Sequence, residues 1–162
     1  MESLKEKPEK RVLFVCLGNI CRSPAAEHVL RKIIDEEGRE SEWIIDSAGI
    51  GGWHVGDLPD KRMRVHGQRR NITMNHICRQ VKGSDFDDFD LIIGMDDQNI
   101  SELRRLAPSL EASKKIVPMA VFVDRDYHCD HIPDPYYSGS EGFELVLDLL
   151  ENGCRNLFDI LS

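Results

Sequence analysis

The chain has 162 residues, of which 41% are hydrophobic and 31% charged, and its formal net charge is −8. This length and composition are typical of one soluble globular domain, not of a disordered, fibrous or disulfide-stapled protein. The longest apolar stretches fall short of the ~20 residues that a membrane span needs, and residues 1–10 lack the apolar core of a secretory signal. The acidic balance disfavours nucleic acid as a partner, because a negative field repels polyanions.

The cysteines indicate the redox environment of the chain. There are five, an odd number, and no pair has the two-residue spacing of zinc or thioredoxin motifs. Free thiols of this kind are typical of a reducing compartment. We therefore expect a cytoplasmic protein.

The first elements can be predicted from the N-terminus onward. Residues 1–10 alternate acidic and basic side chains, and we expect a disordered charged tail followed by one domain over residues 11–162. The apolar run Val12–Cys16 is typical of a buried strand. A helix is expected from Pro24, with Ser23 as its N-cap and Gly38 just past its end.

The remaining chain alternates between strands and helices. The expected elements are a strand over 43–46, a Gly-rich loop, a helix after Pro59, a strand over 90–94, a helix over 98–106, a short strand over 115–117 and a helix over 142–160. This order indicates an α/β layer fold with a mostly parallel sheet and helices on both faces. A ligand site in such a fold lies beyond the carboxyl ends of the strands.

The loop after the first strand carries the strongest chemical signal. It begins at Cys16 and reaches Arg22 just before the helix. Its backbone N–H groups can wrap an anion, the helix N-terminus adds positive potential, and Arg22 can grip two phosphate oxygens at once. The same field favours the thiolate form of Cys16 as a nucleophile. The predicted binding residues of this loop are Leu17, Gly18, Asn19, Ile20 and Cys21.

Chemistry on a phosphate ester also needs an acid that protonates the leaving oxygen. Asp134 is the best candidate, because it lies between two prolines in a polar segment outside the expected helices. Asp96 is better placed to cap the helix after the third strand. On chemistry alone, the rivals of Asp134 are Asp96, Asp124, Asp126 and Asp130.

Several motifs together resemble one protein family. The stretch Val15–Pro24, the segment Asp46–Gly49, Trp53-His54 and the segment Asp134–Tyr137 resemble the low molecular weight protein tyrosine phosphatases, in the family's order and over about residues 11–160. The resemblance implies a three-layer, doubly wound, flavodoxin-like α/β/α domain with a four-stranded parallel sheet. It implies hydrolysis of phosphotyrosine and small aryl phosphates through a cysteinyl-phosphate, without cofactor or metal. We expect a monomer that self-associates weakly at most.

The resemblance also suggests supporting residues. It implies that Asn19 adopts a left-handed conformation held by hydrogen bonds to Ser47 and His76. Independently, the hydroxyl of Ser23 is placed to stabilise the thiolate. Oxidation could join Cys21 to Cys16 in a protective disulfide.

Aromatic residues define the expected substrate class. Trp53 and Tyr136 are candidates for the walls of a slot that accepts a flat phenyl ring, and the resemblance makes Tyr136 and Tyr137 candidate targets of tyrosine kinases. Two alternatives stay open. One is arsenate reduction on the same fold, which needs Cys78 or Cys129 to reach Cys16. The other is a phosphate-binding module without catalytic activity.

Overall fold

A computed structural model describes the whole chain, residues 1–162, as a sheet with helices on both faces. The four strands are all parallel and lie in the order β2-β1-β3-β4. Their bounds are β1 Lys10–Cys16, β2 Trp43–Gly49, β3 Leu91–Gly94 and β4 Ile116–Pro118. The three-layer, doubly wound α/β fold that the sequence predicts is confirmed.

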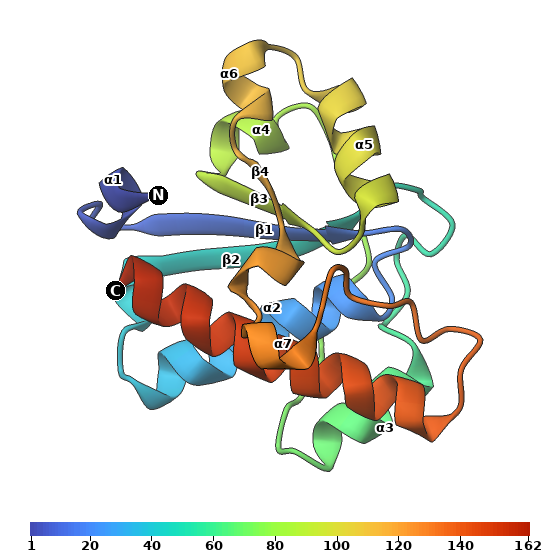
Figure 1. Cartoon of the computed structure of the whole chain (residues 1–162). Helices are drawn as coiled ribbons and strands as arrows, with labels where there is room; N and C mark the ends of the chain where they lie inside the picture. Colours follow the sequence, from blue (N-terminus) through green and yellow to red (C-terminus); the bar gives the residue numbers. More distant parts are fainter.

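Helices form the two outer layers (Figure 1). One layer holds α2 (Arg22–Glu36), α3 (Lys61–Gln68) and α7 (Ser140–Leu161), and the other holds α4 (Asp85–Asp88), α5 (Asp97–Leu106) and α6 (Leu110–Ser113). The short helices outside these layers are α1 (Glu2–Lys5), η1 (Glu40–Glu42), η2 (Met119–Phe122) and η3 (Arg125–Tyr127). None of the helices is long and apolar enough to cross a membrane.

Strand β1 is buried on both faces, which explains its uninterrupted apolar run. Val12, Phe14 and Cys16 belong to a core of 31 buried residues shared with α2 and α7. Leu13 and Val15 point the other way, into a core of 10 buried residues beneath α5. Alternate side chains of one strand therefore hold the two helical layers to the sheet.

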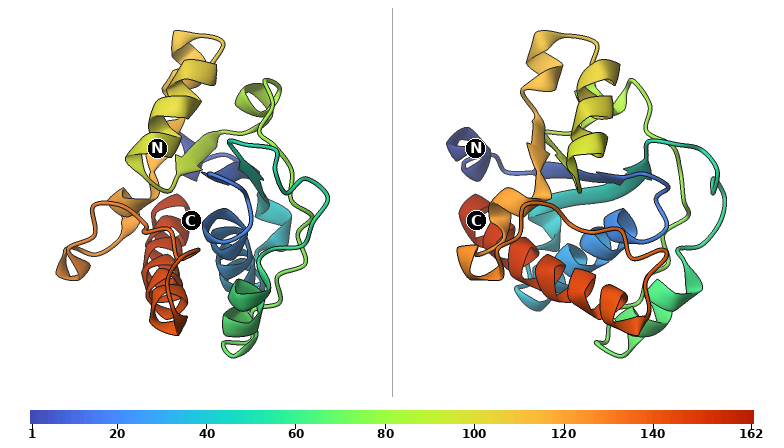
Figure 2. Two further views of the ribbon diagram at one scale, coloured as in Figure 1. Left: turned by 90° about the vertical axis from the view of Figure 1, so that its right-hand side faces the viewer. Right: turned by 45° about the vertical axis from the view of Figure 1, so that its right-hand side comes forward.

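The strand order reverses at β1, which lies between β2 and β3. In an open parallel sheet the crevice at such a reversal lies outside the carboxyl ends of the strands. Figure 2 (left) looks onto this edge, where the loops that follow β1 and β2 face the viewer. The loop after Cys16 begins there, as expected.

The N-terminus of α2 differs from the expectation. The helix begins at Arg22, and its N-cap is Cys21 rather than Ser23. Ser23 does not cap because its hydroxyl is engaged by Cys16 and Asn19. No side chain satisfies the first N–H groups of α2, so they stay available to a ligand.

The N-terminal segment also differs, because residues 1–10 are not the disordered tail that we expected. Residues Glu2–Lys5 form α1, and Leu4 packs against the larger core. The Lys7 ammonium lies 2.6 Å from an Asp90 carboxylate oxygen, and Lys10 already belongs to β1. One apolar side chain and one ion pair tie the segment to the domain, and the charge pattern did not indicate either contact.

Candidate active site

A pocket of about 250 Å³ lies at the carboxyl end of β1, with Cys16 in its lining. The first loop, the loop after β2 and the segment before α7 all contribute to it. The lining residues are Cys16, Leu17, Gly18, Ile20, Cys21, Arg22, Trp53, His54, Asp134, Tyr136 and Tyr137. The structure thus brings the predicted catalytic residues together.

The loop between β1 and α2 offers a run of unused donors. The backbone N–H groups of residues 17–23 donate to no acceptor within the protein, and the first backbone bond into α2 comes from Ala25 to the Cys21 carbonyl. Successive free N–H groups that lead into a helix N-terminus form a concave anion site. This is the geometry that a tetrahedral oxyanion requires.

Arg22 is buried beside this loop, and hydrogen bonds from one nitrogen of its guanidinium hold it in place. Its Nη1 donates to Asp96 Oδ2 at 2.7 Å and to the Ile132 carbonyl at 3.0 Å. Its Nε and Nη2 make no hydrogen bond within the protein and can donate to two oxygens of a phosphate. Burial alone would lower the pKa of Arg22, but electrostatic attraction to Cys16 and Asp96 and the hydrogen bond to Asp96 raise it. The guanidinium therefore stays charged.

Asn19 fixes the shape of the loop. Its φ of 60° lies in the left-handed region, where asparagine is tolerated better than most residues. Its Oδ1 accepts from the Arg79 backbone N–H at 2.9 Å and from His76 Nε2 at 2.8 Å, while its Nδ2 donates to Ser23 and Ser47. The contacts to Ser47 and His76 are those that the family resemblance implied.

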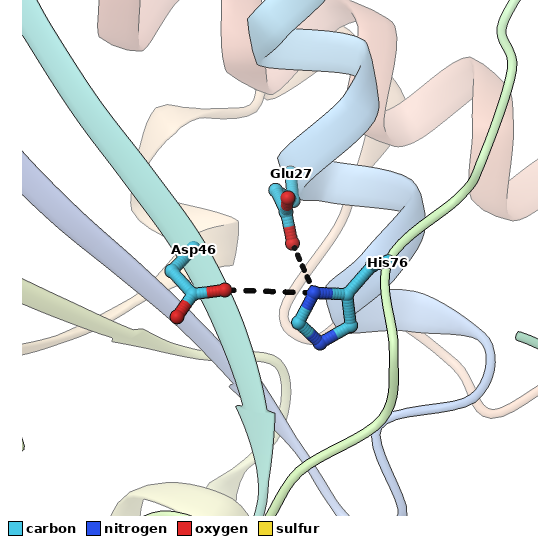
Figure 3. Close-up of side chains that lie close together, drawn as sticks. All are labelled: Glu27, Asp46 and His76. Atoms are coloured by element: carbon cyan, nitrogen blue, oxygen red, sulfur yellow. Dashed lines mark ion pairs between the residues drawn. The ribbon is translucent and has the colours of Figure 1, made fainter. Parts of the chain in front are cut away.

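Two carboxylates lie against the far side of the His76 ring (Figure 3). Glu27 from α2 and Asp46 from β2 approach Nδ1 at 3.2 and 3.5 Å. Burial lowers the pKa of His76, and the two carboxylates oppose that shift by favouring the charged ring. These side chains are of the type that binds metals, but Ser47 donates to Glu27 and Arg79 to Asp46, so the cluster is already engaged in supporting Asn19.

Ser23 lies directly against the sulfur of Cys16. The two atoms are 3.0 Å apart, and both residues are buried. Because Asn19 Nδ2 can only donate, the Ser23 oxygen accepts from it at 2.8 Å. The Ser23 hydrogen then has two acceptors within reach, the Cys16 sulfur at 3.0 Å and the Ala48 carbonyl at 3.4 Å. A hydroxyl that donates to the sulfur stabilises the thiolate, as we expected of Ser23.

Asp134 reaches the mouth of the pocket from the segment before α7. The Tyr136 backbone N–H donates to its Oδ1, and its Oδ2 lies 3.8 Å from Arg22 Nη2. Asp96 instead uses its oxygens to cap α5 through Asn99 and to hold Arg22. The remaining rivals, Asp124, Asp126 and Asp130, do not line the pocket.

Aromatic side chains form the outer wall. Trp53 is 70% exposed, and its ring lies so close over Gly51 that a Cβ there would overlap it. Tyr136 packs edge-on against Tyr137 and beneath the Arg62 guanidinium. Exposed rings around an anion site are suited to a flat aromatic group.

The sequence interpretation missed one wall of the pocket. His54 lines it and packs over Gly18, where a Cβ would lie 3.2 Å from the His54 ring. Its signal in the sequence was the pair Trp53-His54, which belongs to the motifs that carry the family resemblance. Cys21 is buried in the same lining, and burial raises the pKa of its thiol above the ordinary range. Its disulfide with Cys16 stays a prediction.

The fold and the site define a class of phosphate-ester hydrolase with a cysteine at the base of an N–H-lined loop and an arginine and an aspartate beside it. Residues 11–162 match the family of low molecular weight phosphotyrosine protein phosphatases, and the chain belongs to this family. It is a phosphoric monoester hydrolase that acts on phosphotyrosine through a cysteinyl-phosphate intermediate.

Individual relatives agree with this assignment. The chain is 44% identical to the low molecular weight protein-tyrosine-phosphatase YfkJ of Bacillus subtilis, over 90% of this chain and 92% of that protein. It is 38% identical to the human low molecular weight phosphotyrosine protein phosphatase, over 94% and 96%. The crystal structure of a protein tyrosine phosphatase from Entamoeba histolytica superposes with a TM-score of 0.89 at 43% identity, over 93% and 96%.

Proposed function

We propose that Cys16 is the nucleophile, Arg22 the clamp on the phosphate and Asp134 the acid and then the base. The observation that carries this proposal is the run of unpaired N–H groups over residues 17–23, which leads from the Cys16 sulfur into the start of α2. Such donors match the equatorial oxygens of a phosphoryl group during transfer.

The reaction takes place in two steps. In the first, the Cys16 thiolate attacks phosphorus, the P–O bond to the leaving group breaks, and Asp134 gives its proton to the leaving oxygen. In the second, the Asp134 carboxylate takes a proton from water, the water oxygen attacks phosphorus, and the P–S bond breaks to release phosphate and the thiolate. One carboxyl group serves both steps, as microscopic reversibility allows.

The substrates that fit this site are phosphotyrosine proteins and small aryl phosphates. Trp53 and Tyr136 support this choice, because both are exposed in the pocket wall where a phenyl ring would leave the loop. We also propose that the chain works in the cytoplasm, since all five cysteines are free thiols, and that it works as a monomer. Elution at the mass of one chain at working concentration would support the monomer, and elution as a stable dimer would contradict it.

Burst kinetics with p-nitrophenyl phosphate test the roles of these residues. We expect a fast release of one equivalent of nitrophenol, followed by slower turnover limited by hydrolysis of the phosphocysteine. Cys16→Ser removes both phases and still binds phosphate. Turnover that survives in Cys16→Ser would exclude Cys16 as the nucleophile.

Burst kinetics and a separate assay of arsenate turnover distinguish the two alternatives. A phosphate-binding module would bind phosphate without a burst in the wild type. Arsenate reduction would need a second thiol that reaches Cys16, and it predicts thioredoxin-dependent arsenate turnover above that of p-nitrophenyl phosphate. No observation favours it, because the Cys78 thiol donates to the Asn19 carbonyl and Cys129 to the His131 carbonyl.

A further inference from the structure

Four carbonyl groups of the loop between β1 and α2, residues 16–22, called the phosphate loop below, are held by donors from outside the loop. The Cys16 carbonyl accepts from the Ile50 N–H and the Leu17 carbonyl from the Gly51 N–H, both at 2.9 Å. The Ile20 carbonyl accepts from a further backbone N–H, that of Asp60, at 2.8 Å. Each of these contacts holds a carbonyl, which would repel an anion, outside the anion site.

Asn19 is the exception, because a side chain holds its carbonyl. The Cys78 Sγ donates to the Asn19 oxygen across 2.8 Å. Cys78 is buried, and burial raises the pKa of its thiol to about 11, so the hydrogen that makes this bond is retained at neutral pH. The reaction described above does not use this thiol.

The direction of the Asn19 carbonyl decides where the next N–H points. A trans peptide unit is planar, so its C=O and N–H point in opposite directions. The carbonyl of Asn19 and the N–H of Ile20 belong to one such unit. Holding the carbonyl toward Cys78 therefore directs the Ile20 N–H away from Cys78, toward the phosphate side of the loop.

The backbone at Asn19 needs this support. Its positive φ is a conformation that costs free energy for a residue with a side chain, so the surroundings must hold it. Cys78 is itself fixed, because its N–H donates to the Asp57 carbonyl and its carbonyl accepts from the Gly56 N–H. The thiol therefore approaches the loop from a rigid position.

We propose that Cys78 is a positioning residue for catalysis, whose thiol holds the Asn19–Ile20 peptide with its N–H directed at the substrate phosphate. This inference rests on the proposed role of the loop as the phosphate site. Cys78 acts through the backbone and does not touch the substrate. Without the thiol, the Asn19 carbonyl loses its partner and the peptide can turn toward the anion.

The test compares Cys78→Ala with Cys78→Ser, using the inhibition constant of vanadate and the KM of p-nitrophenyl phosphate. Alanine removes the donor, and we expect both constants to rise about three- to ten-fold, the loss typical of one hydrogen bond. Serine keeps a donor at nearly the same place, and we expect both constants to stay within about two-fold of the wild type. Cys78→Val, a second donor-free variant that fills the space, is expected to behave like alanine.

Cys154→Ala is the matched control. Cys154 is also a buried thiol that donates to a backbone carbonyl, that of Ala26 in the core, at 3.6 Å. Its loss is expected to lower the melting temperature without changing the vanadate constant. The inference is overturned if Cys78→Ala and Cys78→Val bind vanadate like the wild type, or if Cys78→Ser is as weak as alanine. Failure of the wild type to bind vanadate would instead overturn the proposed function of the loop.

Discussion

Two aspartates lie beside Arg22, and their hydrogen bonds give them different tasks. Asp96 accepts from the Asn99 N–H with one oxygen and from Arg22 with the other, so both oxygens are occupied. Asp134 uses only Oδ1 in a hydrogen bond within the protein, and its side chain is 44% exposed. Asp134 is therefore the carboxyl group that can donate and accept a proton, because one of its oxygens accepts no hydrogen bond and the side chain is accessible to solvent.

Replacing Asp134 is therefore expected to slow the chemistry itself. We expect Asp134→Asn to lower kcat/KM for phosphotyrosine, which reports the step that releases the leaving group, about 10²- to 10⁴-fold, the usual contribution of a general acid. The effect is expected to be smaller for phosphates whose leaving group needs no proton. Steady-state kinetics with a series of aryl phosphates, whose phenol leaving groups differ in acidity, measure this dependence.

Asp96→Asn is the control for loss of a carboxylate near Arg22. Because Asp96 orients the arginine, we expect its loss to raise KM without changing the dependence on leaving-group acidity. The role of Asp134 as acid would be untenable if Asp134→Asn kept the wild-type kcat/KM for poor leaving groups.

At the level of elements, the end of β2 is packed directly against the phosphate loop. A Cβ on Gly49 would lie 2.9 Å from the Gly18 carbonyl carbon and 3.0 Å from the Asn19 nitrogen. Both neighbours are backbone atoms and cannot rotate away. The strand can approach the loop this closely only because residue 49 has no side chain.

Gly49→Ala is expected to displace the loop. We expect a loss of about 1–3 kcal/mol in the free energy of unfolding, from overpacking, together with weaker phosphate binding. Urea denaturation and phosphate inhibition measure the two effects. Gly83→Ala is the control, since a Cβ there meets no atom within 4 Å. Equal stability and phosphate binding in both variants would show that the loop tolerates the displacement.

The sequence predicted elements well where periodicity was strong, as in β1 and the helix that became α7. It failed where tertiary contacts decided the outcome. Ser23 has the residue type of an N-cap, but Cys16 and Asn19 engage its hydroxyl, and α2 begins at Arg22. Residues 47–49 extend β2 beyond the predicted strand because they pair with the end of β1.

Most of the candidate site could also be predicted, because Cys16, Arg22 and Asp134 occur in recognisable local patterns. The contacts that orient them join segments far apart in the chain. Cys78, for example, lies 59 residues from Asn19, and nothing near it in the sequence signals its contact with the loop. Spacing along a chain cannot indicate such contacts, because the fold alone brings these segments together.

At the scale of the whole molecule, buried thiols make the free energy of unfolding fall as the pH rises in the alkaline range. Burial raises the pKa of Cys154 above its ordinary value, so the thiol keeps its proton in the folded state. In the unfolded chain the pKa of this thiol is about 8.5. Above the pKa of the unfolded state, the unfolded chain binds fewer protons than the folded protein. The stability that this group provides at neutral pH is therefore lost progressively as the pH rises above that pKa.

This predicts that the stability difference between the wild type and Cys154→Ala narrows as the pH rises. From pH 8 to pH 10 we expect the difference in the free energy of unfolding to shrink by about 2 kcal/mol, because only the wild type carries this buried thiol. Urea denaturation of both proteins in the presence of a non-thiol reductant measures it. A difference that stays constant over this range would mean that the thiol ionises equally in both states.

The most direct test of the account is to identify the covalent intermediate on Cys16. Asp134→Asn mixed with p-nitrophenyl phosphate, quenched in acid within the burst and digested, is analysed by mass spectrometry. We predict one phosphate on the peptide that carries Cys16, attached to that sulfur and absent from Cys21 and Cys78. Continued turnover with no phosphate on Cys16 at any quench time would contradict the account.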